Sequence, residues 1–255
     1  MKDYKGKIIS ITSSKGGVGK TIFATNLAGV YDYLKRKVLL IDMDLSCGGI
    51  SVLLNLDKTK TIYNLNDDII NNRFSEAENY VYHYSEYVDI IPSCRDPRQG
   101  NKIDSKVLEQ IISVYKYYYD VLLIDTTHVP VEATLTALEL SDKVLFMITD
   151  NPLDLKNSAS MLAILKDYNK ENVKVILNNA YRNEKKYFSK FDIKSVIKHN
   201  IDYILPESFF IPNINKYIME GDILVLNKKL AFKDIKDKEL LIKIANDMEG
   251  EKSGK

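Results

Sequence analysis

Short runs of apolar, often β-branched residues recur along this chain, and between them lie segments whose apolar positions repeat every three or four residues. The runs predict strands buried on both faces of a sheet, and the repeats predict helices. The predicted strands are Lys7–Thr12, Lys37–Asp42, Asp120–Asp125, Lys143–Thr149 and Val173–Asn178. The predicted helices are Thr21–Tyr33, Ser105–Tyr118, Val131–Leu140 and Leu155–Tyr168. Because strands and helices alternate, we expect an α/β fold with a doubly wound, mainly parallel sheet in a three-layer α/β/α arrangement.

Four of the predicted strands end on polar side chains. These are Asp42, Asp125, Thr149 with Asp150, and Asn178. In open parallel sheets, ligands bind beyond the carboxyl ends of the strands, so these side chains are expected to converge on one crevice. A single strand that ends in Asp is common, but four polar ends beside the loop described next favour a binding site.

The stretch SSKGGVGKT, Ser13–Thr21, connects the first predicted strand to the first predicted helix. Its three glycines let backbone N–H groups point inward and form an anion-binding nest, to which the helix start adds its positive dipole end. Lys20 can neutralise phosphate oxygens, and the Thr21 hydroxyl can ligate Mg²⁺. The usual phosphate-loop pattern, G-x-x-x-x-G-K-[ST], requires glycine where this chain has Ser14. The loop therefore departs from that pattern, and it carries a second lysine, Lys15.

Length and charge limit the function classes. The chain has 255 residues, and 45% of them are apolar, which suffices for one large hydrophobic core. No abrupt change in composition along the sequence marks a domain boundary. We expect a single domain over residues 1–249 and a flexible tail over residues 250–255. Because 36 Lys and Arg balance 35 Asp and Glu, the net charge of +1 gives no general attraction to nucleic acid or anionic lipid.

Cysteine usage and hydropathy indicate the compartment. Cys47 and Cys94 lack a CxxC or CxxH pattern, which argues against a zinc site and a disulfide framework and leaves them as ordinary small residues. No apolar run approaches the roughly 18 residues of a membrane-spanning helix, and the N-terminal stretch does not resemble a signal peptide. These features predict a cytoplasmic protein, which partners could recruit to a cell pole or to the inner face of the membrane.

The loop resembles the deviant Walker A motif, K-G-G-x-G-K-[ST], of the MinD/ParA group of P-loop ATPases. By that resemblance, Lys15 reaches the nucleotide of the other subunit and couples ATP binding to formation of a homodimer. A second ammonium is favourable there only when ATP offsets its repulsion from Lys20. The resemblance implies ATP and Mg²⁺ as cofactors. It assigns nucleotide contacts to Lys15, Gly16, Gly17, Val18, Gly19, Lys20, Thr21 and Ile22.

Further motifs of the group follow in order between Lys7 and Leu226. VLLIDMDLS resembles the D-x-D motif, and YYDVLLIDTT resembles the Walker B strand. VILNNA and ILPES resemble the segments that border adenine, which places Asn178, Pro206 and Glu207 at the base. The resemblance assigns Lys15, Lys20 and Asp44 to catalysis, with Asp44 orienting water, and Thr21, Asp42 and Asp125 to the metal. Because no separate strong base is evident, we expect slow ATP hydrolysis stimulated by dimerisation.

Residue types exclude some relatives within the group. The nitrogenase iron protein needs cysteines from two loops, iron–sulfur carriers have a CxxC, and bacterial tyrosine kinases end in a tyrosine cluster; this chain lacks all three features. The stretches that begin at Leu45, Glu132 and Tyr187 are most similar to the pilus-assembly group called CpaE or TadZ, without its N-terminal receiver-like domain. We therefore expect a positioning ATPase with protein partners in a pilus or secretion apparatus. MinD-like division-site and ParA-like partition roles remain alternatives, and a biotin-pathway or amide ligase would need a substrate pocket that the sequence does not locate.

Two predicted helices bear on contacts with DNA and membranes. Around Ser189–His199, Ile193, Val196 and Ile197 are expected to face the core, and the opposite face is basic through Lys190, Lys194 and Lys198. Such a stripe could contact DNA phosphates, but Asp192 and Glu184 dilute its charge and no aromatic or arginine reader accompanies it, so an ordinary solvated face is favoured. The terminal helix has an apolar stripe whose acidic neighbours favour packing on the domain over peripheral membrane contact. That stripe consists of Leu240, Leu241, Ile244, Ala245 and Met248.

Overall fold

The computed structural model describes residues 5–46, 48–57, 60–167, 172–179, 188–209, 211, 214–227 and 235–250. In this part of the chain, eight strands form one sheet in the order β3-β4-β2-β5-β1-β6-β7-β8. Neighbouring strands are parallel except β3 and β4, which are antiparallel. The predicted mainly parallel, doubly wound sheet is therefore confirmed. The strands are β1 (Lys7–Thr12), β2 (Val38–Met43), β3 (Tyr82–His83), β4 (Val88–Ile91), β5 (Val121–Thr126), β6 (Lys143–Ile148), β7 (Val173–Asn178) and β8 (Tyr203–Leu205).

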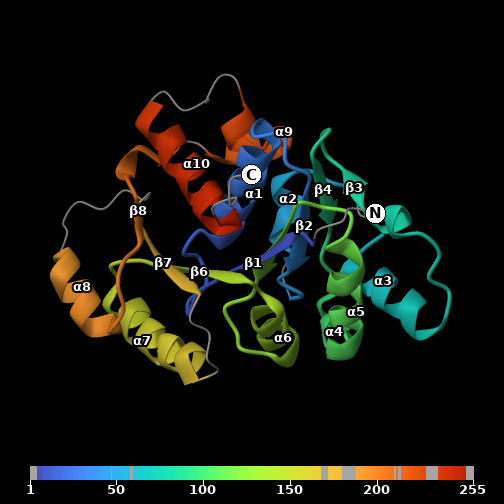
Figure 1. Ribbon diagram of the computed structural model, residues 1–255, viewed down its shortest axis with the longest axis horizontal. Coiled ribbons are helices and arrows are strands. Elements are labelled where there is room, and N and C mark those ends of the chain that lie inside the picture. Colours follow the sequence, from blue (N-terminus) through green and yellow to red (C-terminus); the bar gives the residue numbers. More distant parts are fainter. Residues whose placement is uncertain are drawn as a thin grey trace, which may run out of the picture.

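Helices cover both faces of the sheet and complete the three layers (Figure 1). One layer holds α1 (Lys20–Tyr33), α2 (Gly49–Leu53), α9 (Ile214–Glu220) and α10 (Ile235–Glu249). The other holds α3 (Ile62–Ile70), α4 (Pro97–Gly100), α5 (Ser105–Tyr115), α6 (Glu132–Leu140), α7 (Pro152–Asp167) and α8 (Lys190–Ile197). Short 3-10 turns lie at Ala77–Tyr80, Glu207–Phe209 and Leu224–Leu226.

The position of the strands between two helix layers explains their continuous apolar sequences. Along β2, Val38 and Leu40 pack with α1 on one face, and Leu39 and Ile41 pack with α5 on the other. All four side chains are fully buried. Because successive side chains point to opposite faces, a strand covered on both sides needs apolar residues at every position.

The five predicted strands are found within one residue of their expected bounds, and the elements that were not predicted are short. Strands β3, β4 and β8 have two to four residues each, too few for a hydrophobic pattern, and α2, α3, α4 and α9 were also missed. The predicted helix Ser105–Tyr118 ends at Tyr115 instead. The carbonyl of the next residue, Lys116, accepts a hydrogen bond from the backbone N–H of Gly6 at 2.7 Å, which draws the chain toward β5.

The terminal helix α10 packs on the domain, as its acidic residues predicted. Leu241, Ile244, Ala245 and Met248 are buried in the core beside α1, and Leu240 is partly buried against the same core. This stripe is therefore occupied by the protein's own core and cannot lie in a lipid surface without unpacking. Within the described ranges, we find no helix that is both long enough and apolar enough to cross a bilayer.

Candidate nucleotide-binding site

The loop between β1 and α1 has the backbone of an anion nest. Gly17 has φ 78° and Gly19 has φ 97°, a region that residues with a Cβ rarely adopt. Gly19 caps α1, whose first turn contains no acidic side chain, so the positive end of the helix faces the loop uncompensated. Gly16 and Gly17 are exposed and Lys15 is half-buried, which leaves the outer side of the nest open to solvent.

Gly19 is the glycine of the loop that tolerates replacement least. A Cβ at this position would lie 2.8 Å from Nδ2 of Asn178, whereas a Cβ at Gly17 would meet nothing within 4 Å. Left-handed backbone costs about 1–2 kcal/mol for a residue with a Cβ, so Gly17→Ala introduces strain alone. Gly19→Ala adds displacement of the Asn178 amide, which donates to the carbonyl of Val18 in the loop. We expect Gly19→Ala to weaken nucleotide binding at least about tenfold more than Gly17→Ala. Titration with a fluorescent ATP analogue measures both; equal affinities would contradict this account of the loop.

Lys20 lies inside the protein and is tied to the start of the loop. Its side chain is buried, and its ammonium donates to Oγ of Ser13 at 3.0 Å; the Ser13 hydroxyl in turn donates to the carbonyl of Lys15 at 2.8 Å. Burial lowers the pKa of Lys20, and the carboxylates of Asp125, Asp44 and Asp154 oppose that shift. The two lysines of the motif are thus linked through one serine hydroxyl.

Asp42 and Asp125 sit side by side at the carboxyl ends of β2 and β5, where they are register partners. Both side chains are fully buried. Burial, reinforced by the nearby Asp125, raises the pKa of Asp42 well above its ordinary value, although its oxygens accept from the backbone N–H groups of Asp44 and Ile50, each at 3.1 Å. Burial also raises the pKa of Asp125, to about 7.

The surroundings of Asp125 fit a hydrated Mg²⁺. Neither of its carboxylate oxygens accepts a hydrogen bond within the described residues, and such an unpartnered buried carboxylate is costly without a cation or ordered water. The Thr21 hydroxyl is near enough to lower the pKa of Asp125, although no hydrogen bond of ordinary geometry joins the two. No cluster of three or more His, Cys, Asp or Glu side chains in the described part of the chain could enclose a metal alone. The site therefore suits an ion that Thr21, Asp42 and Asp125 would hold together with nucleotide phosphates, whose charge the ion would neutralise.

Asp44 belongs to a loop that is anchored at several points. Its carbonyl accepts from Oγ of Ser93 at 2.8 Å and from the backbone N–H of Gly48 at 2.9 Å, and its Oδ1 accepts from Oγ of Ser46 at 2.8 Å. Ser46 thus holds the Asp44 carboxylate by a short local hydrogen bond. Asp44 is half-buried and close enough to raise the pKa of Lys20.

The residues predicted at the base lie on the other side of the loop. Nδ2 of Asn178 donates to the carbonyl of Val18 at 2.8 Å, so this amide is joined to the phosphate loop itself. Asn178 pairs in register with Leu205 at the end of β8, which places Pro206 next to it and starts the turn at Glu207. Pro206 is half-buried and Glu207 is exposed. Their contact with adenine stays a prediction.

Sequence reasoning missed one residue beneath the loop and misplaced another on α8. Asp154 in the first turn of α7 is fully buried and hydrogen-bonded to Ser14, a contact that local spacing cannot reveal. Val196 is 43% exposed and does not face the core, because it falls beyond the edge of the stripe formed by Ile193 and Ile197. Phe191 is 77% exposed beside the exposed lysines, so an aromatic side chain does accompany this basic face.

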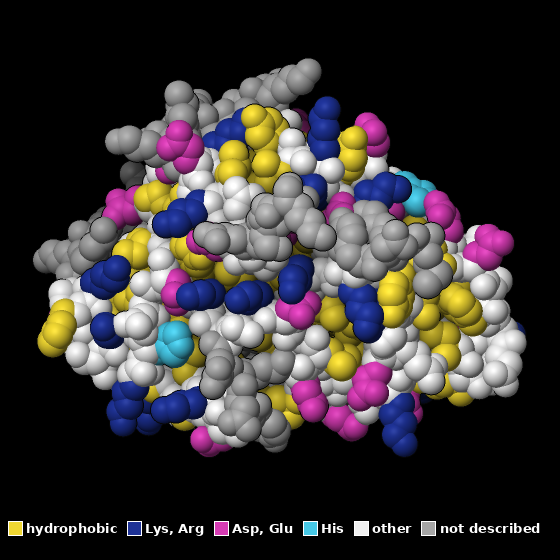
Figure 2. Space-filling view, viewed as in Figure 1, with side chains coloured by type: hydrophobic (Ala, Val, Ile, Leu, Met, Phe, Trp, Pro, Cys, Tyr) yellow, Lys and Arg dark blue, Asp and Glu magenta, His cyan; other side chains and the backbone are white. Residues whose placement is uncertain are grey.

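The charges on the visible face of the molecule are uneven. Figure 2 shows Lys and Arg side chains gathered toward the side that carries α7 and α8, and more Asp and Glu toward the side that carries α3 and α5. Cys94 is buried, as an ordinary small residue would be. Cys47 and Glu184, and the tail at 251–255, lie outside the described residues.

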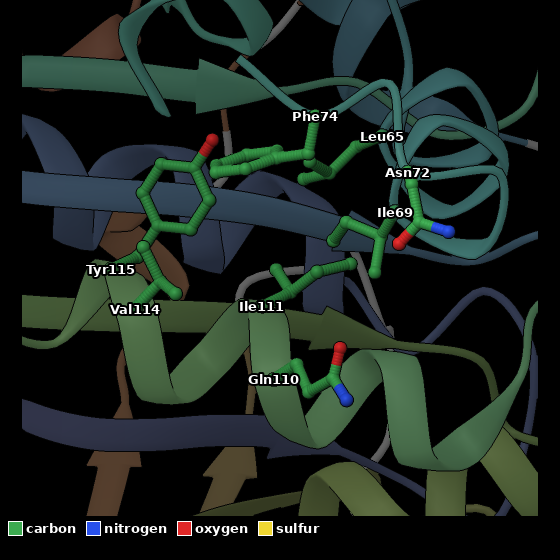
Figure 3. Close-up of a pocket in the computed structure, with 8 residues that line it drawn as sticks. All are labelled: Leu65, Ile69, Asn72, Phe74, Gln110, Ile111, Val114 and Tyr115. Carbon is green, nitrogen blue, oxygen red and sulfur yellow. The ribbon is translucent and has the colours of Figure 1, made fainter. Parts of the chain in front are cut away.

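A separate cavity of about 360 Å³ lies between α3 and α5 (Figure 3). It is floored by aliphatic and aromatic side chains, with the amides of Asn72 and Gln110 at its margin. It shares no residue with the phosphate loop and contains no charged side chain, so it is not the nucleotide site. The lining residues are Leu65, Ile69, Asn72, Phe74, Gln110, Ile111, Val114 and Tyr115.

The fold and the loop together define a P-loop nucleotide-binding protein. The model of the AAA domain family called AAA_31 matches residues 6–179, more than half of the chain, and the chain belongs to this family of MinD/ParA-type P-loop ATPases.

Three curated relatives are similar in sequence. An uncharacterized ATP-binding protein of Methanocaldococcus jannaschii is 28% identical over 160 residues, which are 60% of this chain and 59% of that protein. The antiactivator FleN of Pseudomonas aeruginosa is 27% identical over 69% of this chain and 62% of its own. The septum site-determining protein MinD of Thermotoga maritima is 24% identical over 80% of this chain and 76% of its own. The matches thus span less than two thirds of the first two relatives.

Solved structures agree on the fold. A ParA family ATPase from Chlorobium tepidum superposes with a TM-score of 0.80 at 20% identity, covering 94% of this chain and 99% of that one. MinD of Pyrococcus horikoshii complexed with Mg-ADP gives 0.73 at 26% identity, covering 94% of each chain. The MinC:MinD cell division protein complex of Aquifex aeolicus gives 0.73 at 24% identity, covering 98% of each.

Proposed function

We propose that the protein is a Mg²⁺-dependent ATPase that forms a homodimer around ATP and returns to monomers after hydrolysis. The observation that carries this proposal is the placement of Lys15. Its side chain belongs to the half-buried outer rim of the nest, and within the described residues its ammonium makes no ion pair or hydrogen bond, whereas Lys20 is buried inside. Lys20 binds the phosphates of the nucleotide in its own subunit, and Lys15 is placed to bind those of the nucleotide in a second copy.

The proposed chemistry needs positioning and charge more than a strong base. Lys20 and the loop amides bind the phosphates, Thr21, Asp42 and Asp125 hold Mg²⁺, and Asp44 orients water toward the γ-phosphate. A carboxylate that orients water without a strong base gives slow turnover. Slow turnover suits a protein whose ATP-bound state must last long enough to act as a spatial signal.

The cellular role we favour is that of a positioning ATPase of the division-site or partition kind. The stretches that begin at Leu45, Glu132 and Tyr187 favoured a pilus or secretion apparatus. The named relatives reported above are instead a MinD, a ParA family ATPase and an antiactivator. No finding supports the CpaE/TadZ group. The MinC:MinD complex supports a protein partner for the ATP-bound dimer. We retain assembly of a pilus or secretion apparatus as the other form of this role.

Lys15→Ala tests the proposal directly. Light scattering of the wild type should show dimers with a non-hydrolysable ATP analogue and monomers with ADP. Lys15→Ala should stay monomeric with both, while its affinity for ATP changes little, because Lys20 and the loop amides remain. Lys20→Ala is the matched control and should lose ATP binding itself. An unchanged dimer fraction in Lys15→Ala would reject the mechanism.

DNA binding is a second candidate, supported by the exposed face of α8. Its three lysines and the exposed ring of Phe191 combine charge with a stacking surface. ATP-dependent binding to a nonspecific duplex should weaken with salt and fall when Lys190, Lys194 and Lys198 are replaced by alanine. Replacing Lys60, Lys102 and Lys106, which are exposed on another side, controls for the loss of three positive charges. Equal binding by the two variants would exclude α8 as the DNA surface.

A further inference from the structure

The residue that makes this loop depart from the usual pattern is held by α7. Oγ of Ser14 lies 3.1 Å from Oδ1 of Asp154 and 2.8 Å from Oγ of Ser158. One arrangement of protons satisfies both contacts: Ser158 donates to Ser14, and Ser14 donates to the carboxylate. Glycine at position 14 could make neither contact, so the substitution ties the loop to a helix about 140 residues away in sequence.

Asp154 is a buried carboxylate whose oxygens are occupied by this network. One oxygen accepts from the backbone N–H of Thr149 at 2.6 Å and from Thr149 Oγ1 at 2.8 Å; the other accepts from Ser14 and lies 3.4 Å from Oγ of Ser158. The side chain is fully buried. A buried carboxylate is tolerated when its hydrogen bonds are complete, and such a group holds its donors in fixed places. Asp154 therefore joins the end of β6, the first turn of α7 and the phosphate loop.

The segment that follows β5 lies near the loop on the opposite side of β1. In the sheet, β1 lies between β6, which leads to α7, and β5, which leads to the segment containing His128. The ring of His128 lies near Gly16, where a Cβ built on that residue would be 3.4 Å from Cε1. The carbonyl of Lys15 is fixed as well, by Ser13 at 2.8 Å. The main chain of Lys15 is thus restrained through Ser13 and Ser14, while its own side chain is left without a partner among the described residues.

We propose that Asp154 is a positioning residue that acts through Ser14 to place Lys15 for the nucleotide of the second subunit. This inference rests on the proposed ATP-dependent dimer and names the residues that prepare it. A lysine side chain is flexible, so the reach of its ammonium depends on where its backbone is held, and misplacement by about 1 Å is enough to weaken a charged contact severely. Among the described residues, the hydrogen bonds of Asp154 and Ser158 to the candidate nucleotide site all go to Ser14. The Asp154 carboxylate also acts through space on Lys20 and opposes the lowering of its pKa.

The test separates dimer formation from nucleotide binding. In Ser14→Ala and in Asp154→Asn, the dissociation constant of the dimer formed with a non-hydrolysable ATP analogue should rise about tenfold, and the ATP affinity of the dilute monomer should change less than about threefold. Ser14→Thr keeps the hydroxyl and should restore dimerisation. In a double-mutant cycle, Ser14→Ala should add little to Asp154→Asn, because both break the same link. Asn157→Ala, on the exposed face of α7, is the matched control.

The possible outcomes are distinct. A loss of monomer ATP affinity that equals the loss of dimerisation would show a merely structural role and overturn the inference. Unchanged dimerisation in Ser14→Ala would overturn it too, and this variant removes one hydroxyl from a partly exposed site, so it does not depend on the folding of Asp154→Asn. Lys15→Ala measured in parallel keeps the two proposals apart. If Lys15→Ala fails to dimerise while Ser14→Ala dimerises normally, the dimer mechanism stands and only the role of Asp154 falls.

Discussion

Asp125→Asn should stabilise the nucleotide-free protein above pH 7 while abolishing its Mg²⁺-dependent activity. The wild-type carboxyl has a pKa raised from 3.8 to about 7 by burial. Between these values the folded state binds more protons than the unfolded state, so Asp125 makes stability fall as the pH rises from about 4 to about 7. The full shift corresponds to a loss of about 4 kcal/mol in the free energy of unfolding across this pH range. An unsatisfied amide in the variant offsets about 1–3 kcal/mol of that gain.

Urea denaturation of the two proteins at several pH values, with EDTA and without nucleotide, measures this difference. The advantage of Asp125→Asn should be largest at pH 8 and should disappear near pH 4. Mg²⁺ and ATP should then stabilise the wild type much more than the variant, because ligands that bind only the folded state raise its stability. A constant difference across this pH range would mean that the Asp125 carboxyl is satisfied in the folded protein, contrary to its buried and unpartnered position.

Asp44→Asn should halt the proposed ATPase cycle in the dimeric, ATP-bound state. The loop of Asp44 is anchored through its backbone by Ser93 and Gly48, so the substitution should leave the loop in place and change only the carboxylate. Loss of a group that orients the attacking water, or that accepts a proton from it, lowers turnover by about 10²–10⁴-fold. ATP-bound dimers should consequently accumulate with ATP itself, whereas the wild type needs a non-hydrolysable analogue to do so.

Phosphate release and light scattering on the same sample check both parts of this expectation. Ser46→Ala is the matched control, because it removes the 2.8 Å hydrogen bond to the Asp44 carboxylate without removing the carboxylate. It should slow turnover much less than Asp44→Asn. Normal turnover in Asp44→Asn would remove Asp44 from the chemistry and leave water orientation to another group.

The central part of the fold could be predicted because its strands are long and buried on both faces. Across β1, β2, β5, β6 and β7, most side chains are apolar and buried, and these strands therefore stand out in the sequence as apolar runs. The strands toward the sheet margins gave no such signal. In β3, both residues are exposed, and β8 has three residues. Their pairing depends on tertiary contacts that the local sequence does not encode.

The candidate site could be predicted where its residues follow one another along the chain. The phosphate loop and the aspartates at the strand ends have fixed local spacing, so their proximity follows from a parallel sheet. Asp154 lacked such a signal, because an acidic residue in the first turn of a helix usually faces solvent. Its significance depends on Ser14, from another part of the chain. The polar residue that directly follows β6, Thr149, was the available hint that this helix begins beside the site.

Mixing two inactive variants gives the most direct test of a lysine that acts across the subunit interface. Lys15→Ala keeps Asp44 but lacks the crossing lysine, and Asp44→Asn keeps Lys15 but cannot hydrolyse its own ATP. If Lys15 acts on the partner's nucleotide, a mixed dimer contains one complete site. An equimolar mixture should then regain phosphate release, at up to about half of the wild-type rate per mixed dimer, because each mixed dimer has one complete site of two. No activity above that of the separate variants, at concentrations where mixed dimers are detected, would contradict the account.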